Sequence, residues 1–170
     1  EVGLHCNYRT IASTALTALP ECFLGIVPGW GGATLLPKLI GPERAVQVII
    51  LNALNNNTMM KAKEAQGLGV VDAVFEPADF LEKSIAFAAR IISGSAKIER
   101  KDYSTDPNWD KALDVGKAAI AKKFGGADIE APRRALELIS AARSNTLDQG
   151  FDAEDEILAN LVMGNPLRAS

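Results

Sequence analysis

One stretch of the chain, residues 19–32, decides how the fold is interpreted and reads LPECFLGIVPGWGG. It places a proline directly before the carboxylate of Glu21, then an apolar turn and a glycine cluster, an order typical of an active-site wall. A second carboxylate, Glu1, lies twenty residues earlier. Two carboxylates that face one pocket can share acid and base work on a water molecule. Taken singly, Glu1 fits a solvated helix residue and Glu21 a turn residue, but their spacing and sequence context favour a functional pair.

This stretch closely resembles the enoyl-CoA hydratase (crotonase) family. In that family, a glutamate at the start of a helix and a second one in a Pro-Glu pair further along handle water together. The resemblance implies that Glu1 and Glu21 are catalytic and that Gly29 brings its backbone close to the catalytic water. The segment AQGLGVVD, residues 65–72, resembles the helix–glycine–strand segment of the same family. Asn7 and Ala18 stand where an aspartate and a glycine are expected, and neither departure touches the glutamates.

The glycine cluster of residues 29–32 also admits other interpretations. As Gly-x-Gly before a helix it has the form of a dinucleotide fingerprint, but Pro28 interrupts the residues ahead of it and no acidic residue follows at the expected distance. A tight turn chosen for helix–loop packing remains an alternative for Gly31 and Gly32. Trp30 either lines and reshapes the acyl pocket or packs in the core as a large apolar side chain.

The resemblance implies an α/β crotonase-like fold, the ClpP/crotonase spiral, here mostly helical because the first half of the domain would precede Glu1. Residues 126–165 are similar to the helical extension of multifunctional β-oxidation α subunits, although any amphipathic helical tail has the same periodicity. In those proteins the extension leads to a 3-hydroxyacyl-CoA dehydrogenase domain. We therefore expect residues 1–94 to be the C-terminal part of a hydratase domain. Residues 95–170 are then a loop and helical extension toward a dehydrogenase domain that this chain does not contain.

The implied activity is the reversible hydration of a trans-2-enoyl-CoA to a 3-hydroxyacyl-CoA in fatty acid β-oxidation. The oxyanion donors and the CoA-binding residues are expected upstream of Glu1, so we expect the isolated chain to be inactive. Two alternatives stay open. The first is an enoyl-CoA isomerase of the same fold, which needs a single proton shuttle, so the presence of both glutamates argues against it. The second is a non-catalytic fragment that serves as an assembly module.

The resemblance also implies the molecules with which the chain acts. The substrate is a CoA thioester, so no cofactor is expected in this chain, and NAD is expected only if a dehydrogenase domain follows Ser170. The expected protein partners are the missing N-terminal half of the domain and either further copies of the chain or the thiolase β subunit of a β-oxidation complex.

Composition argues against several other classes of protein. The apolar fraction of 48% and the charged fraction of 23% are those of a soluble globular protein. A net charge of −3 argues against a nucleic-acid partner, because there is no basic excess to follow phosphates. Pro20, Pro28 and Pro37 break the apolar stretches well short of the roughly 20 residues that a transmembrane helix needs.

The two cysteines, Cys6 and Cys22, are too few for the disulfide framework of a small secreted protein. His5 precedes Cys6, but the chain has no second histidine and the spacing matches no zinc pattern. We therefore expect a packed or surface histidine, two reduced thiols, no metal and a cytoplasmic location.

Local patterns predict a little β structure and a purely helical last third. Thr58 is expected to cap one helix, Asp79 and Glu82 to form a capping box for the next, and Gly67 and Gly150 to mark helix ends. The apolar stripes of the last two helices need cover, chiefly at Leu136, Ile139, Leu158, Leu161 and Val162. The expected strands cover 8–12 and 70–75, the expected loop covers 95–107, and the expected helices cover 33–40, 42–52, 59–66, 80–93, 108–124, 131–149 and 152–163.

Overall fold

The structure is a computed structural model that describes residues 1–164, so the end of the expected extension, residues 165–170, lies outside the described residues. Short 3₁₀ and π segments carry the label η. In chain order the elements are η1 (Val2–His5), β1 (Thr10–Ala12), β2 (Leu16–Thr17), η2 (Glu21–Phe23), α1 (Gly32–Ile40), α2 (Pro42–Val46), η3 (Gln47–Asn52), β3 (Met60–Lys61), α3 (Ala62–Leu68), β4 (Ala73–Phe75), η4 (Pro77–Asp79), α4 (Phe80–Ile92), α5 (Trp109–Phe124), α6 (Glu130–Ala141) and α7 (Leu147–Met163).

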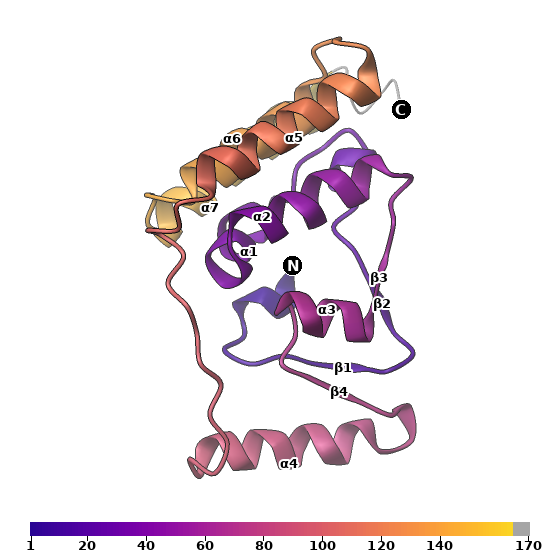
Figure 1. Cartoon of the computed structure of the whole chain (residues 1–170), viewed down its shortest axis with the longest axis vertical. Coiled ribbons are helices and arrows are strands. Elements are labelled where there is room, and N and C mark those ends of the chain that lie inside the picture. Colours follow the sequence, from indigo (N-terminus) through magenta and orange to yellow (C-terminus); the bar gives the residue numbers. More distant parts are fainter. Residues whose placement is uncertain (165–170) are drawn as a thin grey trace.

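The elements are arranged in layers (Figure 1). Helices α5, α6 and α7 form one layer, α1 and α2 lie next to it, and α3 lies between these helices and strands β1 and β4, with β2 and β3 at its side. Helix α4 covers the far side of β1 and β4, and an extended connection leads from α4 back to α5. Strands β1 and β4 pair in parallel with Ile11 opposite Val74, whereas β2 and β3 pair antiparallel. The two pairs are small, so most of the chain is helical, as predicted.

Most of the expected elements are confirmed. The strand over 8–12 appears as β1, the helix over 33–40 as α1, and the one over 108–124 as α5. Gly41 and Pro42 start the next helix, because proline at the first helical position loses no hydrogen bond. Beyond Val46 this helix continues as the π segment η3, a local change of winding that apolar spacing does not reveal.

The expected helix at 59–66 has the wrong boundaries. Met60 belongs to β3, which pairs with β2, so that α3 begins only at Ala62 and Thr58 is not its N-cap. The helix continues through Gly67 and ends at Leu68. Gly69 then takes the left-handed conformation at φ +87°, which glycine adopts without steric cost. The stop signal is therefore the second glycine of the pair, not the first.

The expected capping box at the start of α4 is also absent from the structure. Asp79 precedes the helix, but its side chain makes no capping hydrogen bond. Its Oδ2 instead lies 2.7 Å from Nζ of Lys83, one helical turn further along. This ion pair is exposed, so water screens it and it contributes little to stability.

The expected helix end at Gly150 is wrong. Helix α6 ends at Ala141, and α7 begins after Thr146, whose Oγ1 accepts the N–H of Gln149 at 3.2 Å. The Gln149 side chain accepts the N–H of Thr146 in return at 3.0 Å, which completes a capping box. Gly150 is buried inside α7 against the side chain of Thr34, where a β-carbon would overlap it. This glycine permits a close packing contact and does not end a helix.

Helices α6 and α7 both pack on α1 and on each other, and α6 also packs on α5, so that most of their apolar side chains are covered. Leu136, Ile139 and Leu161 are at most 5% exposed, and Leu158 is half-buried. Val162, the last of the side chains expected to need cover, remains 43% exposed. The helical last third therefore shares one core with the segments around residues 19–54.

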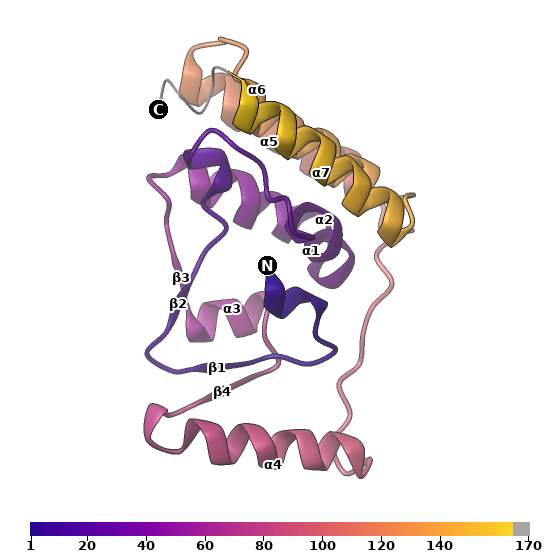
Figure 2. The same ribbon diagram turned by 180° about the vertical axis from the view of Figure 1, so that it is seen from behind.

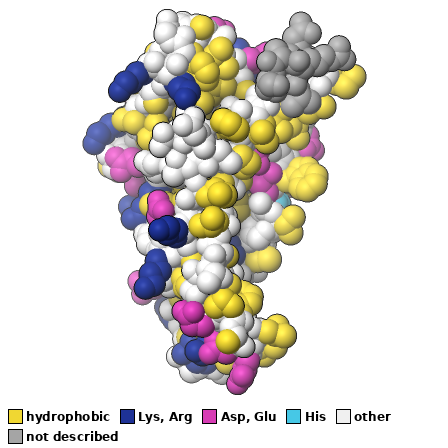
Figure 3. Space-filling view, turned by 90° about the vertical axis from the view of Figure 1, so that its right-hand side faces the viewer, with side chains coloured by type: hydrophobic (Ala, Val, Ile, Leu, Met, Phe, Trp, Pro, Cys, Tyr) yellow, Lys and Arg dark blue, Asp and Glu magenta, His cyan; other side chains and the backbone are white. Residues whose placement is uncertain are grey.

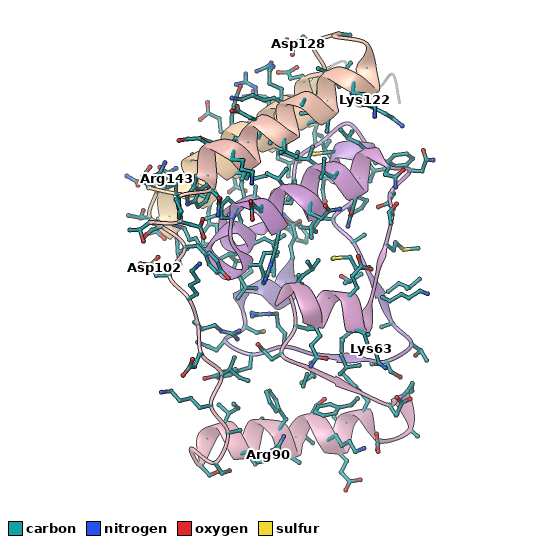
Figure 4. All side chains as sticks on the ribbon, viewed as in Figure 1. Lys63, Arg90, Asp102, Lys122, Asp128 and Arg143 are labelled. Atoms are coloured by element: carbon teal, nitrogen blue, oxygen red, sulfur yellow. The ribbon has the colours of Figure 1, made fainter. Side chains whose placement is uncertain are left out.

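The surface carries both charged and apolar side chains. Figure 3 shows apolar side chains gathered along one face of the molecule. Exposed charged residues lie over every layer (Figure 4), among them Lys63, Arg90, Asp102, Lys122, Asp128 and Arg143. Within residues 1–164, no helix is both long enough and apolar enough to cross a membrane.

Candidate active site

The glycine cluster forms a loop between η2 and α1, and we call residues 29–34, the cluster with the first turn of α1, the glycine loop. Gly29, Gly31 and Gly32 are buried, whereas the side chain of Trp30 is 67% exposed. The alternative that places Trp30 in the core is therefore wrong. Gly31 has a φ of +91° and turns the chain into α1. The loop also packs against η1, because a ring nitrogen of His5 lies 2.9 Å from the carbonyl oxygen of Trp30.

Glu1 lies directly against the glycine loop. Its Oε1 accepts the backbone N–H groups of Trp30 and Gly32, both at 2.9 Å. Two charge-assisted hydrogen bonds fix this oxygen and stabilise a negative charge on it. A cavity of about 60 Å³ adjoins Glu1 and is large enough for a water molecule.

Glu21 is the first residue of η2 and lies close enough to Glu1 for their charges to interact. Its Oε2 is buried and has no hydrogen-bond partner among the described residues. Burial, and after it the negative charge of Glu1, raise the pKa of Glu21 above the ordinary value of 4.5. The structure thus brings the two sequence-predicted glutamates together and gives them different environments, one hydrogen-bonded and one short of partners.

Gly29 is the first residue of the glycine loop and is contacted by a residue from the other end of the sequence. Leu158 of α7 packs against its α-carbon so closely that a β-carbon on residue 29 would overlap the leucine side chain. Among the hydrogen bonds within residues 1–164, none uses the N–H of Gly29 as donor.

A third carboxylate, Glu154 of α7, was not predicted from the sequence. Its side chain is fully buried, and its two oxygens accept the N–H groups of Gly31 and Thr34, both at 2.6 Å. Burial raises the pKa of Glu154. The signal that could have found it is the four-residue spacing of Gly150, Glu154 and Leu158, which puts all three on one face of a single helix. The wrong helix boundary at Gly150 hid that spacing.

The neighbouring cysteines show two different environments. Cys6 is exposed and Cys22 is buried, and both are free thiols. Burial, together with the charge of Glu21, raises the pKa of the Cys22 thiol, so that this cysteine is a packed apolar residue next to the site. In the described part of the chain, no three His, Cys, Asp or Glu side chains gather in a way that could hold a metal ion.

Comparison with protein families supports the resemblance found in the sequence. Residues 1–121 match the family described as enoyl-CoA hydratase/isomerase. The chain is 31% identical, over 99% of its length, to the fatty acid oxidation complex subunit alpha of Idiomarina loihiensis. It is 35% identical over 91% of its length to the subunit of the same name from a Psychrobacter species, and 28% identical over 95% to the peroxisomal fatty acid beta-oxidation multifunctional protein MFP2 of Arabidopsis thaliana. It covers 24%, 22% and 22% of these three relatives, less than a quarter of each.

Solved structures resemble the chain over nearly its whole length. An enoyl-CoA hydratase/isomerase from Pseudoalteromonas atlantica T6c matches 97% of the chain and 51% of its own, with a TM-score of 0.54 and 16% identity. An enoyl-CoA hydratase from Mycobacterium avium subsp. paratuberculosis K-10 matches 98% of the chain and 53% of its own, with a TM-score of 0.53 and 20% identity. At these identities the similarity concerns the fold alone.

Proposed function

The chain belongs to the enoyl-CoA hydratase/isomerase family and has the crotonase-like fold expected from its sequence, and from this premise we propose that it supplies the catalytic carboxylates of an enoyl-CoA hydratase. The proposed reaction is the reversible addition of water to a trans-2-enoyl-CoA in fatty acid β-oxidation. The observation that carries the proposal is the convergence of Glu1 and Glu21 beside the glycine loop, in two different electrostatic environments.

The environments suggest a division of work. The raised pKa of Glu21 keeps a proton on that side chain at a higher pH than usual, which suits the acid that protonates the α-carbon (C2) of the substrate. Glu1, oriented by the N–H groups of Trp30 and Gly32, suits the base that takes a proton from water. The water oxygen bonds to the β-carbon (C3) as the π bond between C2 and C3 breaks, and its electron pair takes the proton of Glu21 at C2. Atoms balance, because water supplies the hydroxyl group and also, once the proton taken by Glu1 passes to Glu21, the proton that replaces the one given to C2.

Gly29 would place the attacking water. Its N–H has no acceptor within the described residues, and it is buried in the same loop whose N–H groups orient Glu1. A backbone N–H that donates to the water oxygen leaves a water hydrogen free to point at the base. Hydration transfers no electrons, so the reaction needs only the CoA thioester and water, and no redox cofactor.

The wider assembly is part of the same proposal. The relatives named as fatty acid oxidation complex subunits match the chain beyond residue 121, so residues 95–170 are proposed as the helical extension of the hydratase portion. A dehydrogenase domain, further copies of the chain, a thiolase β subunit and a cytoplasmic location are proposed from the same similarity. Within the chain, α5, α6 and α7 pack on α1, α2 or η3, which supports a role of the extension in holding the site together.

The proposal is tested by incubating the full-length protein that carries this sequence with a short trans-2-enoyl-CoA. Loss of the conjugated thioester absorbance and formation of 3-hydroxyacyl-CoA, identified by mass, are expected. A product of unchanged mass with a shifted double bond would support the isomerase alternative. Absence of any conversion, with the acyl-CoA still bound, would support a non-catalytic role.

A further inference from the structure

We propose that Glu154 is a positioning residue for the hydration step, which fixes the glycine loop from α7 and through it the orientation of Glu1. The proposal rests on the proposed hydratase function. It gives the helical last third of the chain a direct part in the geometry of the site. The hydrogen bonds join Glu154 to Gly31 and Thr34, which lie 123 and 120 residues earlier in the chain.

The hydrogen bonds of the loop alternate between two carboxylates. The N–H groups of Trp30 and Gly32 donate to Glu1, whereas those of Gly31 and Thr34 donate to Glu154. In chain order, Gly31 therefore lies between the two donors to Glu1, and Gly32 lies between the two donors to Glu154. A shift of the loop away from Glu154 would move the two N–H groups that orient Glu1.

Helix α7 is shaped for this contact. Gly150, Glu154 and Leu158 follow one another at four-residue spacing and lie on the face turned toward α1, beside which α7 lies in Figure 2. Gly150 lies against Thr34, and Leu158 against Gly29, each at a distance that leaves no room for a β-carbon on the glycine. Gly150 and Leu158 thus contact the two ends of the glycine loop, and the carboxylate of Glu154 lies between these two contacts.

The chemistry of the contact also indicates a precise role. A fully buried carboxylate is costly unless hydrogen bonds compensate the loss of water, and Glu154 uses both oxygens on backbone donors near the start of α1. An amide in its place would present an NH₂ group to one of those N–H donors, leaving that donor without an acceptor. The size and charge of the side chain at this position are therefore both constrained.

The test compares four variants in the full-length protein. Glu154→Gln keeps the size and removes the charge, and Glu154→Asp keeps the charge one methylene shorter. Glu156→Gln is the matched control, because Glu156 is exposed on the same helix. Leu161→Ala removes a buried side chain of α7 that is 2% exposed and is not part of the loop contact, so it reports the effect of destabilising α7 alone.

We expect Glu154→Gln to lower kcat by about 10- to 100-fold and to change KM by no more than about twofold. A loss of this size in rate is typical when a catalytic group is displaced by about 1 Å. Hydrogen exchange at the amides of Gly31 and Thr34 should accelerate. Glu154→Asp should recover part of kcat. Glu156→Gln should match the wild type, and Leu161→Ala should lower the melting temperature while the folded protein keeps its kcat.

Two results would overturn the inference while the hydratase function stands: an unchanged kcat in Glu154→Gln, or an equal loss of kcat in Leu161→Ala at a temperature where both variants are folded. A wild-type protein that binds acyl-CoA and does not hydrate it would overturn the proposed function, and the positioning role with it. The activity of the wild type thus separates the two failures.

Discussion

Glu1 and Glu154, from opposite ends of the described chain, accept alternate backbone N–H groups of the same glycine loop. The charge of Glu1 also contributes to the raised pKa of Glu154, after burial, so the two carboxylates are close enough to interact. One consequence is that the glycine loop and α7 form a single structural unit. A substitution on one side of the loop should therefore alter the geometry on the other side.

The first prediction concerns Glu21. If it supplies a proton during hydration, Glu21→Gln should lower turnover by at least about 10²-fold, the usual contribution of a general acid or base. Binding of an unreactive acyl-CoA should change little, because the amide keeps the shape of the side chain. Glu64→Gln, on the exposed face of α3, is the control and should keep full activity. Near-normal turnover in Glu21→Gln would remove this residue from the mechanism.

The second prediction concerns the stability of the fold as a function of pH. Burial raises the pKa of Glu21 above 4.5, so the folded protein retains a proton that the unfolded chain has already lost. The folded state binds more protons, and the contribution of Glu21 to the free energy of unfolding is therefore lost as pH rises from 4.5 through the raised pKa. The amide introduced by Glu21→Gln cannot ionise. Over this pH interval the melting temperature of the variant should therefore rise relative to that of the wild type. Parallel melting curves of both proteins from acid to neutral pH would contradict the prediction.

The third prediction uses two glycines inside helices. Gly67 lies within α3 with no other atoms near the position of a β-carbon, so Gly67→Ala should stabilise the protein by about 0.5–1 kcal/mol through helix propensity. Gly150→Ala gains the same propensity but forces a methyl group into Thr34, and overpacking of this kind costs about 1–3 kcal/mol. Chemical denaturation should give shifts of opposite sign. A stabilised Gly150→Ala variant would mean that α7 can move away from α1 at little cost.

The fourth prediction concerns the 170-residue chain alone. We expect it to hydrate no enoyl-CoA, because a carboxylate pair needs the thioester oxygen held by donors, and loss of one such donor typically costs about 10²–10³ in rate. Large apolar side chains of α4 are exposed, with Leu81 at 72%, Ile85 at 62% and Ile92 at 87%. The isolated chain should therefore self-associate, as measured by light scattering. Appreciable turnover by a homogeneous, monomeric sample of the chain would show that no further segment is needed.

The sequence by itself determined several of the local elements and predicted the pairing of the first two carboxylates. The start of α1 after a glycine cluster and the start of α2 at Pro42 depend on nearest neighbours along the chain, so local patterns predict them. The grouping of Glu1 and Glu21 follows from a resemblance in a continuous stretch of about twenty residues. The catalytic roles of Glu1, Glu21 and Gly29 stay predictions until the variants are measured.

Only the tertiary structure decided the parts that depend on distant contacts. Met60 is in a strand because β2 offers it a partner. Residue 150 can pack against Thr34 inside α7 because it is a glycine, since a β-carbon there would overlap the threonine side chain. Glu154 is one of several carboxylates on an amphipathic helix, and its four-residue spacing from Gly150 and Leu158 becomes informative only once α7 is known to run through Gly150. Its role arises because folding buries it against the N–H groups of Gly31 and Thr34, and a buried carboxylate must bond to the donors that it meets.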